Sequence, residues 1–314
     1  MARFAFDIGS WVVHLLVGVD GTVPMKKRKR SPSDIRSASL LKTPPSESNL
    51  KPSSSRIGLN RWMNSPGTAS MHYEPTEIEH VANIVTHGIW IPLAVYQLHT
   101  LVESTRSCLP GRVVLSAWLY GVALVLLFAV STLFHCFSWA GKRKLAGIFH
   151  RGDRGMIYLF IAASYFPWLA LSEVSHHSSL NVALEWVLWV SALFGIAWEQ
   201  ITFSHSFRGR KLISTLLYII VGLLPGLLLL SQWDDWVQME GVVHGGFYFL
   251  VGVLFFKLDG RLPFAHAIWH VHVICGAFEV HSSVSPLVSV SGSRLLLQSK
   301  SSSMPLNSFN AGLR

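Results

Sequence analysis

Val113-Val-Leu-Ser-Ala-Trp-Leu-Tyr-Gly-Val-Ala-Leu-Val-Leu-Leu-Phe-Ala-Val-Ser-Thr-Leu-Phe-His135 is the stretch that decides the fold of this chain. It contains no acidic or basic side chain before its terminal histidine. It is also long enough to cross the hydrocarbon core of a bilayer, which requires ~20 apolar residues in a helix. The stretch therefore predicts a membrane-spanning helix. Ser131 and His135 lie four residues apart at its end, so they share one helix face.

The remainder of the chain repeats this apolar pattern. Hydrophobic residues make up 50% of the sequence and charged residues 14%, whereas soluble domains carry about 25% charged residues. We expect seven spans, at 79–102, 113–138, 155–172, 182–203, 212–231, 238–257 and 265–288. The predicted fold class is an all-α integral membrane protein with a seven-transmembrane helix bundle.

Basic residues alternate between the two sides of this predicted bundle. They are concentrated before the first span and in the loops that follow the second, fourth and sixth spans, and the other loops hold few or none. Cytoplasmic loops of membrane proteins carry the excess of Lys and Arg. We therefore expect a cytoplasmic N-terminus and a C-terminus on the opposite side. This orientation is opposite to that of the G-protein-coupled receptors and weighs against that class.

The regions outside the spans divide the chain further. We expect a disordered, basic and Ser/Pro-rich extension at 1–60, a juxtamembrane segment at 61–77, a membrane domain at 78–288 and a Ser-rich tail at 289–314. The basic run Lys26–Arg30 precedes a membrane bundle, which favours contact with anionic lipid over binding of nucleic acid. A merely solvated tail is the alternative. The three cysteines have no close spacing, so we predict neither a disulfide framework nor a cysteine zinc site.

Three histidines are predicted to meet near the cytoplasmic end of the bundle. His266 and His270 point the same way from the start of span 7, and His135 lies about one turn from the inner end of span 2. Three imidazoles that leave one coordination position open are the pattern of catalytic zinc, which lowers the pKa of a bound water to about 7. Asp153, at the start of span 3, would accept the proton of that water. Ser131 would orient the water or a ligating imidazole.

Each of these residues also has a purely structural interpretation. A lone His-x3-His pair is a weak metal signal, and Ser131 alone fits a hydroxyl that bonds a carbonyl of its own helix. His87 fits a hydrogen-bonded interior histidine, and His272 points away from the face shared by His266 and His270. A helix N-terminal cluster, favoured by the helix dipole, is the alternative for the polar group that begins span 1: Thr76, Glu77, Glu79 and His80.

Four motifs carry a family resemblance. They are Glu77-Ile-Glu79-His80 with Asn83 and His87, Ser131-Thr-Leu-Phe-His135, Asp153-Arg-Gly-Met-Ile157 and His266-Ala-Ile-Trp-His270. Together they resemble the progestin and adipoQ receptor family, which includes the adiponectin receptors and the bacterial haemolysin III-like proteins. Further segments, including Tyr73-Glu-Pro-Thr-Glu77 and Ile161–Trp168, resemble its differentiation-factor branch.

The resemblance covers about residues 61–277 and implies a seven-helix bundle with a cytoplasmic N-terminus. It also implies that His135, His266 and His270 are zinc ligands, with Ser131 and Asp153 beside them. The two ends of the chain depart from the family pattern. Residues 1–60 extend the N-terminus, and after Ala277 the last helix carries residues that are unfavourable in the outer half of a membrane helix: Glu279, His281 and Pro286. This rewritten end puts the full crossing of the last helix in question.

Two functions follow from the resemblance and the site. The first is a membrane signalling receptor or regulator in Golgi membranes, acting on kinase or Ras-type signalling, with a mainly structural zinc and with the basic loop 142–154 in contact with cytoplasmic proteins. The second is a ceramidase-like, zinc-dependent hydrolase that uses a zinc-bound hydroxide on a ceramide-type lipid amide. A transporter or channel fits poorly, because rings of charged residues are lacking in the outer half of the spans.

Overall fold

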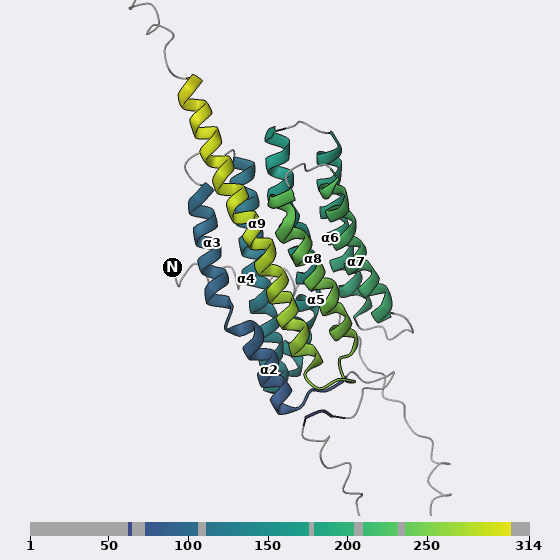
Figure 1. Ribbon diagram of the computed structural model, residues 1–314. Coiled ribbons are helices and arrows are strands. Elements are labelled where there is room, and N and C mark those ends of the chain that lie inside the picture. The colour runs from purple at the N-terminus through teal and green to yellow at the C-terminus, as the bar shows by residue number, and fades with distance from the viewer. Residues whose placement is uncertain are drawn as a thin grey trace, which may run out of the picture. The chain divides into compact units, whose positions relative to one another are not determined.

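The computed structural model describes residues 62–64, 73–105, 111–175, 179–203, 210–231 and 236–302, all within the compact unit Leu59–Arg314. The regular elements of this part are helices (Figure 1): α2 Glu77–Gly88, α3 Ile91–Thr105, α4 Gly111–Trp139, α5 Arg143–Ser175, α6 Ser179–Thr202, α7 Arg210–Leu230, α8 Trp236–Lys257 and α9 Ala265–Ser302. By length and composition they provide seven candidate membrane spans, the first formed by α2 and α3 together. The predicted seven-helix membrane fold is confirmed. The extension predicted at 1–60 and the end of the tail lie outside the described residues.

The first span is broken where the sequence predicted one continuous helix. Trp90 N–H donates to the His87 carbonyl at 3.1 Å, so the chain tightens at the end of α2 before α3 begins at Ile91. This break lies just beyond His87, and it lets α2 and α3 take different directions along α4 and α9 (Figure 1). Hydropathy reports only that both pieces are apolar, so it does not reveal the break.

The third span begins earlier than predicted. Residues 143–154 were expected to be part of a basic cytoplasmic loop, but they form the first three turns of α5. The connection from α4 is a short turn in which Gly141 has φ +66°, a conformation that glycine adopts without steric strain. The density of charged side chains obscured the helix in the sequence. As a result, Asp153 lies in the interior of α5, beside α4. The sequence had placed it at the start of this helix.

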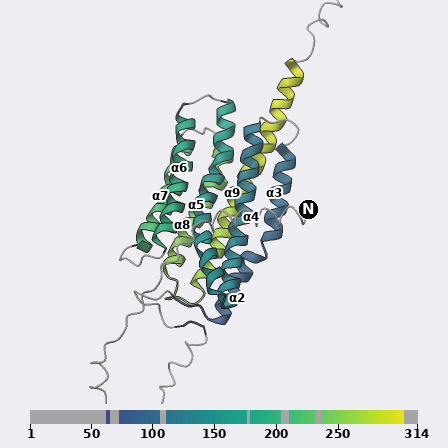
Figure 2. The same cartoon turned by 180° about the vertical axis from the view of Figure 1, so that it is seen from behind.

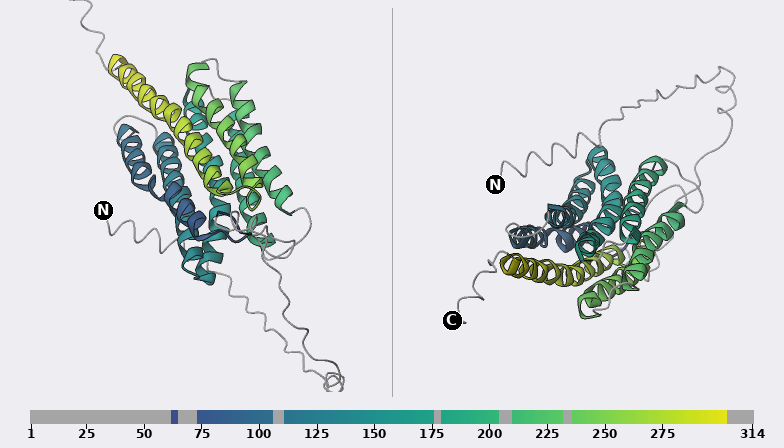
Figure 3. Two further views of the ribbon diagram at one scale, coloured as in Figure 1. Left: turned by 60° about the horizontal axis from the view of Figure 1, so that its bottom comes forward. Right: turned by 90° about the horizontal axis from the view of Figure 1, so that it is seen from above.

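Helix α9 lies between the early helices and the later ones. Figure 3 shows it in yellow, with the blue helices α2–α4 on one side and the green helices α7 and α8 on the other. Small residues bring α8 and α9 close together, as is common between membrane helices. A Cβ added at Gly241 would lie 2.3 Å from the Glu279 carbonyl oxygen, and Gly241 N–H donates to Ser283 Oγ at 3.0 Å.

The part of the last helix that departs from the family pattern, after Ala277, packs against α4 and α8. Helix α9 continues without interruption past Ala277 and through Pro286 to Ser302, and its candidate span is Ala265–Ser289. His281 stacks on Tyr120 of α4 with ring centroids 6.0 Å apart, and Glu279 faces His244 of α8 at 3.9 Å. The unfavourable polar residues therefore face neighbouring helices. Inward positions of the same stretch of α9 are apolar and buried: Val280, Val284 and Val288.

One end of the bundle collects the polar residues singled out in the sequence. The start of α2, the end of α4 and the loop from α8 to α9 all lie at the lower end of Figure 1, and the view from behind in Figure 2 agrees. Four helices, α2, α4, α5 and α9, contact one another in this part of the fold.

Candidate metal centre

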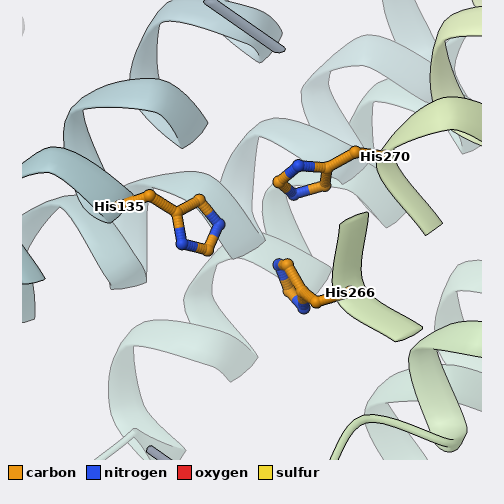
Figure 4. Close-up of side chains that lie close together, drawn as sticks. All are labelled: His135, His266 and His270. Carbon is orange, nitrogen blue, oxygen red and sulfur yellow. The ribbon is translucent and has the colours of Figure 1, made fainter. Parts of the chain in front are cut away.

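The structure brings His135, His266 and His270 together. His135 projects from α4, the other two project from the first turns of α9, and Figure 4 shows the three rings turned toward a common centre. Each ring offers one nitrogen, and these three nitrogens all lie within 4.8 Å of one another. Ring centroids are 4.9 Å apart for His135 and His266, 5.1 Å for His135 and His270, and 4.6 Å for His266 and His270. This group could hold a metal ion.

Several of the nitrogen atoms at this centre have no hydrogen-bond partner among the described residues. They are buried, and they comprise Nε2 of His135 and both ring nitrogens of His266. Buried polar atoms are almost always paired in native proteins, because an unpaired one loses its hydration without compensation. Imidazole nitrogens that converge in this way are suited to a bound cation such as zinc, for which histidine is a common ligand. The residues present therefore fit a metal ion.

The third histidine is oriented by a residue that the sequence did not reveal. Thr86 Oγ1 lies 2.9 Å from His270 Nδ1, and the same hydroxyl donates its hydrogen to the carbonyls of Ala82 at 2.8 Å and Asn83 at 3.2 Å. Since the hydroxyl hydrogen is used within α2, its oxygen accepts from Nδ1–H of His270. The lone pair of His270 is then on Nε2, available to a metal. Thr86 is 184 residues from His270 in sequence, and no local pattern links the two.

A carboxylate stands beside a second histidine. Asp259, in the turn between α8 and α9, has Oδ2 3.6 Å from His266 Nδ1. Histidines that bind metals commonly have a carboxylate next to the ring nitrogen that faces away from the metal, and this carboxylate raises the basicity of the ligand. In the sequence Asp259 marks only the break before span 7. Its proximity to His266 follows from the tight turn through Gly260, where φ is +73°.

Asp153 and Ser131 lie close to each other, in the same part of the bundle. The Asp153 carboxylate is within electrostatic range of His266 and of the Ser131 hydroxyl. Ser131 is buried, and its hydroxyl makes no hydrogen bond to a carbonyl of its own helix. The alternative in which Ser131 bonds a carbonyl of its own helix is therefore wrong. By contrast, Thr132 next to it does donate to the Phe128 carbonyl, at 2.7 Å.

The helix that carries Asp153 is fixed by a buried ionic network. Arg154 Nε donates to Glu199 Oε2 of α6 at 2.6 Å, and Arg210 at the start of α7 approaches the same oxygen at 3.4 Å. Tyr218 of α7 donates to the Arg154 carbonyl and to Glu199 Oε1, both at 3.3 Å. The Arg154 side chain is thus bound to Glu199. These bonds connect α5, α6 and α7 next to Asp153.

In the polar group at the start of the first span, Thr76 caps α2, as the structural interpretation predicted, and it forms a capping box with Glu79. Glu79 Oε2 accepts from Thr76 N–H at 2.8 Å. Glu79 also accepts from Tyr73 Oη–H at 2.6 Å, and burial together with this carboxylate raises the pKa of Tyr73 above its ordinary value of 10.0. In addition, Phe264 N–H donates to Glu79 Oε1 at 3.1 Å, so the cap of α2 is bound to the residue that precedes α9.

Two further histidines were assigned from the sequence. His87 was expected to be hydrogen-bonded, but neither of its ring nitrogens has a partner among the described residues. It stacks on His270 with ring centroids 3.7 Å apart, and its ring centroid lies 5.2 Å from that of Phe128. His272 does point away from the centre, with Nδ1 2.8 Å from the Ile268 carbonyl of its own helix.

Comparison with known proteins places the chain among related sequences. Residues 76–281 match the family model described as Haemolysin-III related, and this range contains the three convergent histidines together with Asp153 and Ser131. The chain is similar to monocyte to macrophage differentiation factor of Rattus norvegicus, with 36% identity over 224 residues, which is 71% of this chain and 90% of the relative. The Homo sapiens protein of that name is 36% identical over 219 residues, 69% and 87% of the two chains. Hemolysin-3 of Bacillus cereus is 32% identical over 201 residues, 63% and 87% of the two chains.

Proposed function

This chain belongs to the Haemolysin-III related family, and on that basis we propose that it is a zinc-binding membrane hydrolase that cleaves an amide bond of a lipid. One observation carries the proposal: the nitrogens of His135, His266 and His270 converge within 4.8 Å, in the part of the bundle where Asp153 and Ser131 also lie. A structural zinc site is commonly closed by four protein ligands, whereas a catalytic site keeps one position open. A set of three histidines matches the open kind.

The donor set is suited to zinc. Three neutral imidazoles suit zinc, copper, iron or nickel, and carboxylate-rich sites suit magnesium, calcium or manganese. Zinc has no redox chemistry and tolerates a tetrahedral arrangement of nitrogen ligands. Thr86 and Asp259 stand next to His270 and His266 in the way that partners of zinc-bound histidines do.

Asp153 and Ser131 can take separate roles in hydrolysis. When bound, zinc supplies a Lewis acid and a water whose pKa is lowered to about 7. The Asp153 carboxylate would accept a proton at its side-chain oxygen and later return it to the departing amine. The Ser131 hydroxyl, which has no partner in its own helix, would hold a donor or acceptor of the reacting group in place. An amide within a lipid suits a centre that lies inside a membrane-spanning bundle.

A signalling role is the second candidate, and the printed name of the relatives favours it. The similar mammalian proteins are called monocyte to macrophage differentiation factor. In this alternative zinc would stabilise the bundle, and kinase or Ras-type signalling proteins would contact the cytoplasmic face of a Golgi membrane. Exposed basic residues at the end of the bundle that holds the histidines support a cytoplasmic orientation of that end: Lys142, Arg143, Lys144, Lys257 and Arg261.

The metal is the first point to test. Elemental analysis of the detergent-purified full chain should give one zinc per chain, and His270→Ala should remove it. His272→Ala is the matched control, because His272 is on the same helix but is bonded to the Ile268 carbonyl. A zinc content near zero in the wild-type protein, or equal retention by His270→Ala, would refute the zinc assignment.

Turnover then separates the two candidates. Zinc-loaded protein in nanodiscs should release fatty acid from ceramide, and Asp153→Asn should retain zinc but release fatty acid at least about 100-fold more slowly, as expected for loss of a general base. If the wild-type protein holds zinc and releases no fatty acid, the hydrolase proposal is wrong and the signalling candidate stands. An Asp153→Asn variant with the wild-type rate would remove Asp153 from the chemistry.

A further inference from the structure

Helix α2 has its polar face turned toward the interior of the bundle. His80, Asn83 and His87 follow one another at helical spacing, and they are 7%, 1% and 3% exposed. The opposite face of the same helix is apolar and open to the surroundings: Ile78, Val81 and Val85. In a membrane this polarity leaves the outer face in lipid and encloses the polar row inside the protein.

This polar row is not satisfied by the protein. His80 Nδ1, both side-chain polar atoms of Asn83 and both ring nitrogens of His87 lack hydrogen-bond partners among the described residues. Unpaired polar groups are especially unfavourable in a membrane interior, where no bulk water replaces the missing partner. The three side chains make few bonds to one another or to the helix, so a purely structural role does not explain them.

One end of this polar row is next to the candidate metal centre. His87 lies flat against His270, with ring centroids 3.7 Å apart and planes inclined by 16°. Phe128 of α4 covers another side of His87 at 5.2 Å. His87 is not one of the three residues whose nitrogens converge within 4.8 Å, so it borders the centre without completing the ligand set.

We propose that His80, Asn83 and His87 form a polar subsite that binds the neutral head of a lipid substrate through its amide N–H and hydroxyl groups. The inference rests on the proposed function, because it identifies the residues that would hold the substrate next to the metal. A carboxamide offers two donors and an acceptor, and a neutral imidazole offers one of each. A head group that both donates and accepts would satisfy these atoms. An ester of equal size, which only accepts, would leave Asn83 Oδ1 unpaired.

The test compares two lipids and two variants in the full chain. The lipids are a ceramide and a wax ester of matched chain length, and their binding to zinc-loaded protein in nanodiscs is measured by native mass spectrometry. Asn83→Leu removes the carboxamide at similar size, and His87→Phe keeps the ring that stacks on His270 but removes both nitrogens. His272→Phe is the matched control, because this ring faces away from the centre.

We expect the wild-type protein and His272→Phe to prefer ceramide over the wax ester by about 10-fold or more, as expected for hydrogen bonds made at a buried site. Asn83→Leu and His87→Phe should each bind ceramide at least about 10-fold more weakly, bind the wax ester unchanged, and retain one zinc per chain. Ligand-free Asn83→Leu should unfold at the wild-type temperature or higher, because it removes unpaired polar atoms from the interior.

Two results would overturn the inference. Wild-type affinity for ceramide in both variants would mean that the row holds only ordered water. If the variants lose zinc or unfold at a lower temperature as well as binding ceramide more weakly, the three residues have a structural role. A failure of the hydrolase proposal is a separate observation: if ceramide binds with the expected preference but is not cleaved by the wild-type protein, the subsite stands and the hydrolytic activity does not.

Discussion

The Glu79 carboxylate accepts a hydrogen bond from Phe264 N–H at 3.1 Å, and so joins the start of α2 to the turn that precedes α9. The same carboxylate closes the capping box with Thr76 and accepts from Tyr73. Phe264 has φ +57°, a conformation that is uncommon for a residue with a side chain. The position of α9, which carries two of the three convergent histidines, is therefore fixed by a residue of the first helix.

Replacement of Glu79 by Ala should destabilise the protein by about 2 kcal/mol or more, because hydrogen bonds to a charged, buried carboxylate and a helix cap are lost together. Zinc affinity should fall as well, since the start of α9 is released. Thermal unfolding and zinc titration of the detergent-purified variant measure the two effects. Glu77→Ala is the control, because Glu77 is exposed and contributes only through the helix dipole. Equal effects of the two substitutions would contradict this role of Glu79.

Thr86→Val should lower zinc affinity by about 10- to 100-fold, the range found when a partner of a metal-bound histidine is removed. Valine has nearly the shape of threonine, but it cannot accept the proton of His270 Nδ1, so the ring is free to rotate and to change tautomer. Competition with a chelator of known affinity measures the change. Thr132→Val removes a hydroxyl that bonds only the Phe128 carbonyl, and its zinc affinity should equal that of the wild type.

Glu199→Gln should destabilise the bundle by about 3–5 kcal/mol, because it leaves the buried guanidinium groups of Arg154 and Arg210 without a counter-charge. Glu185→Gln on the same helix is the comparison. The side chains of this pair, Arg112 and Glu185, are 38% and 17% exposed, so solvent screens them more than the fully buried Glu199 and the substitution should cost less. Unfolding of both variants in the same detergent should rank them in this order. A smaller effect for Glu199→Gln than for Glu185→Gln would show that the buried network does not hold α5, α6 and α7 together.

Gly241→Ala should separate α8 from α9 and destabilise the protein by about 1–3 kcal/mol, the range for overpacking a closely packed interior. The added Cβ would lie 2.3 Å from the Glu279 carbonyl oxygen, which is backbone and cannot move aside alone. Gly246 lies in the same helix, and a Cβ added there would meet no neighbouring atom within 4 Å. Gly246→Ala should therefore match the wild-type unfolding temperature, or exceed it because alanine favours the helix.

The membrane fold and the common direction of the His266 and His270 side chains are the parts that local sequence determines. Val113–His135 is apolar on all sides and of membrane length, and the same pattern recurs through the chain. The four-residue spacing of His266 and His270 fixes their common direction once the helix forms. The alternation of basic loops, read together with the number of spans, predicts that His135 and Asp153 reach the same end of the bundle. All of these are properties of one helix or of the order of helices.

The partners of the site are decided by tertiary structure. Thr86 meets His270, and Glu79 meets the Phe264 backbone, across more than 180 residues in each case. Helices α2 and α5 both pack against α4, and the sequence revealed neither the break after His87 nor the helical start of α5. Periodicity identifies which face of a helix is polar, but it does not specify the helix that this face will meet. That choice depends on the close packing of side chains from distant segments, which acts only after the helices have assembled.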